Sequence, residues 1–159
     1  MKTQLYIKSV DSSFFNRPNL GIFIDTVFSN FSDLYDFPQL NHNKKEIMRL
    51  LNSQTFHGFL VFHGNKIIGY LLGEVINYNG KKLYFINYLF VSSVFRNKKL
   101  GTQLLDLSKD YAKEQNTEGI GLISDTENDK NFHFYKKHGF DLSDERLHQR
   151  HELFIWNLQ

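Results

Sequence analysis

The chain has 159 residues, a formal net charge of +2 and no cysteine. This length predicts a single domain, residues 1–159, large enough to bury its own hydrophobic core. The lack of cysteine excludes disulfides, thiolate nucleophiles and cysteine-type zinc sites, and the small net charge gives no reason to expect a specific nucleic-acid partner.

Targeting signals are also missing from the sequence. The N-terminus lacks a basic segment followed by an apolar one, so no secretory signal is visible. No apolar run reaches the roughly 18–20 residues that a membrane span needs. We therefore expect a soluble, cytoplasmic protein that binds no membrane.

The first half of the chain contains both helical and strand patterns. Apolar residues at helical spacing predict a helix from Pro18 to Phe31 and a second helix over Asn43–Ser53. The segment Asn30–His42 is rich in rings and acids and is expected to be a loop. Strands are predicted over Leu5–Val10, Phe56–His63, Ile67–Ile76 and Leu83–Val91, the last three forming an antiparallel meander.

The second half of the chain alternates strand and helix. A helix beginning at Leu100 separates the strand Leu83–Val91 from a short strand, Ile120–Ser124, so these two strands are expected to be parallel. The remaining elements are a helix over Asn128–His138, ended by Gly139, and strands over Phe140–Leu142 and Glu152–Leu158. The sum is a mixed, mostly antiparallel α/β sheet with a central parallel pair and about four helices.

A basic turn lies between the central strand and the helix at Leu100. It contains Arg96, Lys98 and Lys99. A helix N-terminus has unpaired N–H groups and the positive end of a dipole, so it attracts phosphate, and these side chains add positive charge there. The segment is a candidate pyrophosphate site, and the alternative is a solvated turn before an ordinary surface helix.

Other nucleotide and metal motifs are absent. No GxxxxGK[ST] loop is present, and Gly119-Ile120-Gly121 precedes a predicted strand instead of following one, which argues against a dinucleotide fold. The pairs His133/His138 and His148/His151 have no matched third ligand, so structural or solvent-facing histidine is favoured over a metal site. We expect no metal cofactor.

Two segments together resemble the GCN5-related N-acetyltransferase (GNAT) superfamily. The family's acyl-CoA loop, Arg/Gln-x-x-Gly-x-Gly/Ala, aligns with Arg96–Gly101, where Lys99 replaces the first glycine. A later signature, Asn-x-x-Ala-x-x-Phe-Tyr-x-x-x-Gly-Phe, matches at Asn128, Phe134, Tyr135, Gly139 and Phe140, with Asn131 in place of alanine. The separation of the two segments and the order of the elements are also those of the family.

This resemblance implies acetyl-CoA as cosubstrate and a GNAT fold whose central parallel strands splay around the acyl-CoA site. The implied cosubstrate-binding residues are Leu89, Phe90, Val91, Arg96, Asn97, Lys98, Lys99, Leu100, Gly101, Thr102, Asn128 and Tyr135. Tyr135 matches the family's general acid, which protonates the departing thiolate. Its alternative role is a ring packed on an amphipathic helix. Where the family's loop has glycine, the Lys99 side chain can reach the phosphates as a point charge.

The resemblance also implies a carboxylate on the central strands as general base, although the strand Leu83–Val91 itself contains no Asp or Glu. Glu74 is the best candidate, and its alternative role is an exposed glutamate near a strand edge or turn. Tyr88 is a further candidate for positioning a water molecule, although a ring in a buried strand usually belongs to the core. Asp33, Asp36 and Glu74 are candidates to attract a cation, or acids that simply face solvent.

The predicted function is transfer of acetyl from acetyl-CoA to a primary amine by direct attack in a ternary complex. The acceptor is a small polyamine-like amine or a protein lysine or N-terminus, and the protein is a monomer or a homodimer. The alternative is a binding or regulatory module that keeps the fold with weak or lost acyl-CoA turnover.

Overall fold

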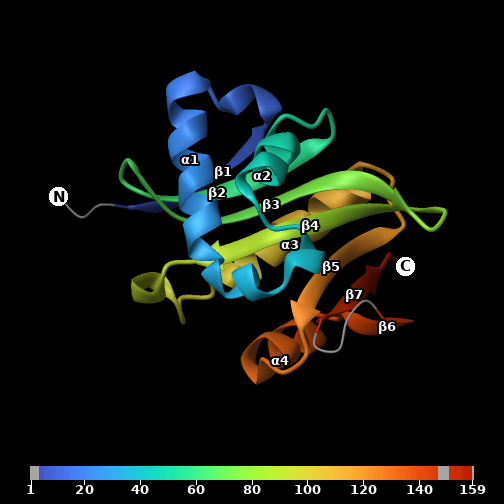
Figure 1. Ribbon diagram of the computed structural model, residues 1–159. Helices are drawn as coiled ribbons and strands as arrows, with labels where there is room; N and C mark the ends of the chain where they lie inside the picture. Colours follow the sequence, from blue (N-terminus) through green and yellow to red (C-terminus); the bar gives the residue numbers. More distant parts are fainter. Residues whose placement is uncertain (1–3, 147–150, 159) are drawn as a thin grey trace.

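One mixed sheet forms the centre of the computed structural model, which describes residues 4–146 and 151–158 (Figure 1). Among these residues the strand order is β1-β2-β3-β4-β5-β7-β6. The strands are β1 (Leu5–Asp11), β2 (Phe56–His63), β3 (Lys66–Tyr78), β4 (Lys81–Val91), β5 (Gly119–Asp125), β6 (Asp141–Arg146) and β7 (His151–Asn157). The α-helices are α1 (Arg17–Asn30), α2 (Lys44–Leu51), α3 (Leu100–Glu114) and α4 (Asp129–Lys137).

Strand pairing follows the predicted topology. β1 to β4 form consecutive antiparallel pairs, and β4 and β5 pair in parallel across α3. In the turn between β3 and β4, Asn79 has φ 48° and Gly80 has φ 83°. Positive φ at both central residues is typical of an Asn-Gly hairpin turn. β7 returns antiparallel to β5 and also pairs with β6. The mixed sheet with a central parallel pair is therefore confirmed.

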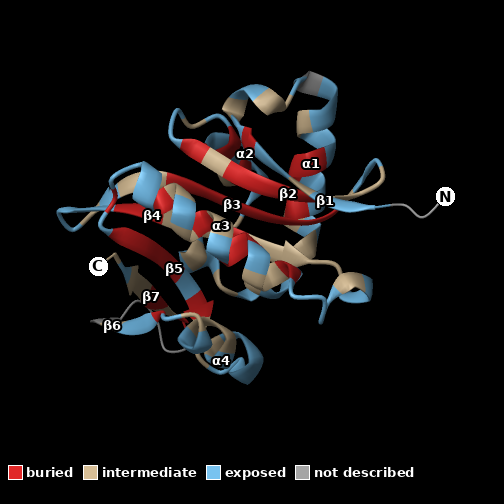
Figure 2. Ribbon diagram, turned by 180° about the vertical axis from the view of Figure 1, so that it is seen from behind, coloured by how far each residue is buried: buried red, intermediate tan, exposed pale blue. Residues whose placement is uncertain are grey.

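Each face of the sheet has its own hydrophobic core. On one face, α1 and α2 contribute Val27, Ile47 and Leu51, which pack against strand residues such as Leu60. On the other face, α3 contributes Leu104 and other residues, and partly buried rings of α4 pack against the same cluster. Figure 2 shows the buried residues concentrated along the inner strands. The central strands are thus held from both sides, which fixes the positions of the residues they carry.

The segment Asn30–His42 is more ordered than the predicted loop. It contains two 3-10 helices, Ser32–Asp36 and Pro38–Leu40. Phe37 donates its N–H to the Leu34 carbonyl, and the fixed φ of Pro38 suits the start of the second turn. These short i→i+3 turns lack the apolar periodicity from which longer helices are predicted. No helix in the described part of the chain is long and apolar enough to span a bilayer.

The central parallel pair opens partway along its length. The ladder joins Leu83–Ile86 of β4 to Gly119–Leu122 of β5, and both strands continue past its end. At the same level the register between β3 and β4 shifts, because Leu72 pairs with Tyr88 while the next residue of β3 pairs with Ile86. Asn87 is the extra residue of this β-bulge. The bulge and the end of the ladder together separate β4 from β5.

Gly119, at the start of β5, lies where the backbones of β5 and β7 approach each other closely. A Cβ at this position would collide with the backbone carbonyl of Trp156. We expect Gly119→Ala to lower the free energy of unfolding by about 2 kcal/mol or more, because backbone on β7 must move. Urea denaturation measures the change.

Gly21→Ala in α1 is the matched control, because a Cβ there meets no atom within 4 Å. Replacing a helical glycine by alanine is expected to stabilise the protein by about 0.5–1 kcal/mol. Equal effects of the two substitutions would contradict the close approach at Gly119.

Candidate active site

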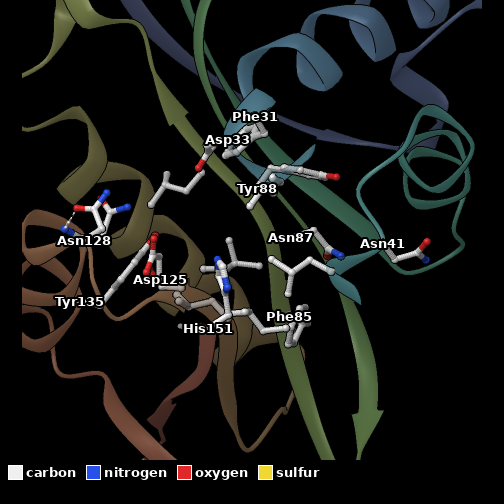
Figure 3. Close-up of a pocket in the computed structure, with 18 of the residues that line it drawn as sticks. Phe31, Asp33, Asn41, Phe85, Asn87, Tyr88, Asp125, Asn128, Tyr135 and His151 are labelled. Carbon is white, nitrogen blue, oxygen red and sulfur yellow. Dashed lines mark hydrogen bonds between the residues drawn. The ribbon is translucent and has the colours of Figure 1, made fainter. Parts of the chain in front are cut away.

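A cavity of about 200 Å³ lies where β4 and β5 diverge. Its lining residues are Phe31, Asp33, Leu34, Leu40, Asn41, Glu46, Leu50, Phe85, Ile86, Asn87, Tyr88, Leu89, Leu122, Ile123, Ser124, Asp125, Asn128, Asn131, Tyr135 and His151. Figure 3 shows side chains from β4, from the segment after α1 and from the region of α4 around one space. The cavity therefore combines the splayed strands with residues of the segment 30–42, which forms one of its walls.

The strand residues expected to hold the cosubstrate lie along β4 beyond the end of the ladder. Leu89 lines the cavity, and Phe90 and Val91 continue the strand to the basic turn. Arg96 folds back over this strand end, where its Nε donates to the Val91 carbonyl at 2.9 Å. This bond ties the turn to β4, and the exposed guanidinium keeps further N–H donors.

The N-terminus of α3 has a free first turn. Asn16, Asn43 and Asn128 cap α1, α2 and α4, each accepting a hydrogen bond from a backbone N–H. At α3 the N-cap residue is Lys99, which makes no capping bond, and no acid stands in the first turn. The first N–H groups of a helix lack intrahelical partners, so those of α3 are available to an anion.

The basic turn keeps a backbone conformation that glycine adopts easily. Lys99 has φ 62° and ψ 20°, and Asn97 has φ 64°, both in the left-handed region. A side chain in this region costs about 1 kcal/mol or more relative to glycine. Lys99 therefore adopts a conformation that a glycine at this position would take at lower cost.

The two sequence signatures are in contact. A Cβ on Gly101 would lie 3.2 Å from the Phe134 ring, so the absence of a side chain at Gly101 lets α4 pack closely on α3. Thr102 Oγ1 lies 3.2 Å from His138 Nε2, which joins the start of α3 to the end of α4. Gly139 follows α4 at φ 90°, as the sequence predicted for a helix end. These contacts fix α4 relative to the basic turn.

Tyr135 reaches the cavity from α4. Its ring contacts Phe140 and Phe154, which are both fully buried, at centroid distances of 5.9 and 5.8 Å. The hydroxyl bonds to none of the described residues, and Figure 3 shows the side chain extending toward the cavity beside Asp125. Burial raises the pKa of Tyr135 to about 12. The phenol is thus held rigidly, keeps its proton at neutral pH and has a free donor.

Asn128 and Asn131 form the start of α4. The Asn128 side chain accepts the N–H of Asn131 at 3.1 Å, so it fixes the first turn of the helix. Both residues also line the cavity. The capping bond uses the Asn128 oxygen, while its amide N–H groups are not part of that bond.

Glu74 lies outside the cavity lining. It is 6% exposed on β3, and Arg49 of α2 donates to it from Nη1 at 3.2 Å and from Nη2 at 2.5 Å. This interaction raises the pKa of Arg49 above its usual range. Both oxygens of Glu74 are therefore engaged by Arg49. The structure does not bring this predicted base together with Tyr135, and its role stays a prediction.

Other acids do line the cavity. Asp33 is exposed at the rim, and Glu46 of α2 accepts from Arg49 Nε at 2.6 Å. Asp125 is contributed by the end of β5. Asp36, the other acid singled out in the sequence, is exposed and does not belong to the lining. No Lys or Arg is among the lining residues, so the cavity has an acidic character.

Asn87 was not predicted as a site residue. Its Oδ1 is buried and has no hydrogen-bond partner among the described residues, and the side chain lines the cavity. A buried amide oxygen without a partner is costly, which points to a donor supplied by a ligand. The only sequence signal was a polar residue in an otherwise apolar and aromatic strand.

Tyr88, the next residue, is engaged elsewhere. Its hydroxyl lies 2.7 Å from His42 Nδ1, and His42 Nε2 lies 3.1 Å from the Phe28 carbonyl. A carbonyl only accepts, so Nε2 carries the proton and Nδ1 accepts from the tyrosine. Tyr88 thus lines the cavity with its ring, while its hydroxyl ties β4 to the segment after α1.

His151, at the start of β7, is a histidine that lines the cavity. Only 3% of it is exposed, and its register partner across β5 is Asp125. The other histidine of the pair, His148, lies outside the described residues. The described residues contain no group of three or more His, Asp or Glu arranged to hold a metal ion.

Comparison with known proteins identifies the family. The model of the acetyltransferase (GNAT) family matches residues 24–140, a range that contains both signatures and most of the cavity. The chain belongs to this family. A comparison with curated protein sequences finds no match.

Solved structures show the same fold at low sequence identity. NAA60 from Arabidopsis thaliana in complex with acetyl-CoA has a TM-score of 0.71 and 15% identity, covering 98% of this chain and 99% of that one. The PaiA N-acetyltransferase from Thermoplasma acidophilum, in complex with coenzyme A, gives 0.71 and 16% over the same shares. An aminoglycoside acetyltransferase, meta-AAC0020 from an uncultured soil metagenomic sample, in complex with sisomicin gives 0.66 and 21%, covering 91% and 93%.

The left-handed conformation of Lys99 leads to a prediction about stability. Lys99→Gly and Lys99→Ala remove the same charge, but only glycine adopts φ 62° without strain. We expect Lys99→Gly to be more stable than Lys99→Ala by about 1 kcal/mol in urea denaturation. The same pair of substitutions at Lys98, which lacks a positive φ, should show no advantage for glycine. An advantage at both positions would mean that the conformation of Lys99 is not the cause.

Proposed function

We propose that this protein transfers the acetyl group of acetyl-CoA to a primary amine. The observation that carries the proposal is the half-buried phenol of Tyr135, packed against Phe140 and Phe154 on the wall of a cavity between diverging strands. Membership of the acetyltransferase family supports it, as do solved structures of the same fold that hold acetyl-CoA or coenzyme A.

The cosubstrate would lie along the gap between β4 and β5. Its phosphates would meet the free N–H groups from about Lys98 to Thr102, with positive charge from Arg96, Lys98 and Lys99. The expected acyl-arm contacts are Leu89, Phe90 and Val91 on β4 and Asn128 at α4, with Asn97, Leu100 and Gly101 shaping the turn. The thioester would then reach Tyr135 inside the cavity.

The reaction would be direct attack within a ternary complex. The amine nitrogen forms a bond to the thioester carbonyl carbon, and the carbon–sulfur bond breaks. Tyr135 gives its proton to the departing thiolate, because its pKa of about 12 keeps it protonated at neutral pH. The nitrogen loses two protons in forming the amide: one balances the proton given by Tyr135 and the other must pass to a base.

The acceptor would be a positively charged amine that enters from the acidic side of the cavity. Asp33, Glu46 and Asp125 supply negative charge, and the unpaired Asn87 Oδ1 can accept an N–H. A small polyamine-like amine and a protein lysine or N-terminus both fit this chemistry. A compound with a second positive charge gains most from the acids.

The competing proposal is a binding or regulatory module with weak or lost turnover. Two observations favour it: Lys99 stands where the family has glycine, and Arg49 engages the predicted base, Glu74. Against it stands the rigidly placed phenol of Tyr135, which a module without chemistry does not need. Both proposals predict binding to CoA, so turnover separates them.

Calorimetric titration with acetyl-CoA and with CoA is the direct test of the cosubstrate site. We expect saturable one-to-one binding of acetyl-CoA, followed by release of CoA when amines are added. The Tyr135→Phe protein should bind acetyl-CoA as the parent does but turn over about 10²-fold more slowly, because it lacks the proton donor. Activity should not fall through ionisation of Tyr135 until the pH approaches 12.

Tyr111→Phe on α3 is the control, because this tyrosine stacks on His57 away from the cavity. Parallel loss of binding and turnover in Tyr135→Phe, or no loss of either, would contradict the acid role. Acetyl-CoA binding without CoA release from any amine would favour the regulatory module.

The acidic rim predicts a preference for diamines. We expect Asp33→Asn to raise KM for propane-1,3-diamine about fivefold and to leave KM for propylamine nearly unchanged, since only the diamine has a second charge to place. Steady-state kinetics with both amines at low ionic strength measure the effect. Asp36→Asn removes an exposed acid outside the lining and serves as the matched control. An equal KM change for both amines would show that Asp33 does not interact with the second positive charge of the diamine.

A further inference from the structure

The reaction proposed above leaves one proton without an acceptor. A lysine-type ammonium has a pKa of about 10.4, so at neutral pH its nitrogen must lose a proton before it can attack. Glu74 was the expected acceptor, but it lies outside the cavity lining and Arg49 engages both of its oxygens. The base should instead be sought among the groups that line the cavity.

We propose that His151 is the general base that takes the proton of the acceptor amine. This inference rests on the proposed acetyltransferase function. His151 lines the cavity together with Tyr135, so an acid and a base would act in one space. Figure 3 shows the His151 ring between Asp125 and Phe85.

The chemistry of the cavity favours an imidazole over the carboxylates. An imidazole has an ordinary pKa of about 6.5 and a carboxylic acid one of about 4, so the imidazole is better matched to proton transfer near neutral pH. Glu46 is also held by Arg49, and Asp125 Oδ1 accepts the Glu127 N–H at 2.9 Å. Asp33 is exposed at the rim.

The surroundings of His151 fix its place. It pairs in register with Asp125, and its ring makes an edge contact with Phe37 at a centroid distance of 4.6 Å. The residue is almost fully buried. Asp125 on the neighbouring strand would stabilise the imidazolium formed by proton transfer. The segment around Phe37 therefore contacts the proposed base and also forms part of the cavity wall.

Two protons leave the amine nitrogen by different routes. One proton passes from the ammonium nitrogen to a ring nitrogen of His151 and then to solvent. The neutral nitrogen attacks the thioester, and Tyr135 protonates the thiolate. The second nitrogen proton, lost as the amide forms, replaces the one that Tyr135 gave. The products are the amide, the free thiol of CoA and one released proton.

The test compares two amines of similar size and different basicity. Ethylamine is protonated at neutral pH, whereas 2,2,2-trifluoroethylamine is already largely neutral and needs no base for its first proton. We expect His151→Gln to lower kcat/KM at pH 7 about 10²-fold for ethylamine and only a few-fold for the fluorinated amine. His133→Gln, on the exposed face of α4, should leave both unchanged.

The pH profile is the second readout. In the parent protein, kcat/KM for ethylamine should rise with pH and level off, while in His151→Gln it should continue to rise as the free amine accumulates. Asp33, Glu46, Asp125, Tyr88 and Tyr135 are the other titratable groups of the lining, and the substitution leaves all of them in place. The change in the profile would therefore belong to His151.

The outcomes separate this inference from the function on which it rests. Equal losses for both amines, with an unchanged pH profile, would mean that His151 is structural, and the inference would be overturned while the transferase stands. If Glu74→Gln instead shows the selective loss for ethylamine, Glu74 is the base. If the parent protein binds acetyl-CoA but acetylates no amine, the proposed function itself fails.

Discussion

The separation of β4 from β5 is the constraint on which the rest of the site depends. Strands in a sheet normally satisfy their backbone groups along their full length, and here the parallel ladder stops after Ile86 and Leu122. The bulge at Asn87, on the β3 side of β4, lies directly after this stop. The central strands beside the gap are packed on both faces by the two hydrophobic cores. The gap is why a cavity exists where sequence patterns indicate only a buried strand.

The walls of the cavity come from segments far apart in the chain, and aromatic packing holds them in place. Tyr135 lies on a short helix that has no fully buried residue, yet its ring is fixed between Phe140 and Phe154. The opposite wall is tied to β4 by the bond between Tyr88 and His42. The high content of Phe and Tyr therefore does more than fill the core. It sets the position of the Tyr135 phenol, the proposed proton donor, on a helix whose own contacts with the core are limited.

Local patterns predicted most of the fold, and long-range contacts decided what they missed. The order of strands and helices could be predicted from hydrophobic periodicity and turn residues. The two family signatures could be recognised from the spacing of their residues. The ion pair of Glu74 with Arg49 joins residues 25 positions apart in the sequence. Patterns within the strand therefore could not show that this carboxylate is engaged by an arginine instead of being available as a base. The bulge at Asn87 is a shift in pairing register, which no pattern within β4 reveals. His151 is distant from the motifs in sequence and reaches the cavity only because β7 pairs with β5.

The net charge of +2 is small, but the fold places basic and acidic side chains in separate regions. Arg96, Lys98 and Lys99 gather at the free N-terminus of α3, while the acids of the lining gather in the cavity. An anionic cosubstrate and a cationic acceptor would therefore be attracted to opposite ends of one gap, and each end repels the other's ligand. The ion pair between the exposed Arg49 and the buried Glu74 belongs to this arrangement. Arg49 also holds Glu46, so one guanidinium anchors α2 to β3 and positions an acid on the cavity wall. Through Arg49, Glu74 therefore helps to hold Glu46 at the cavity wall.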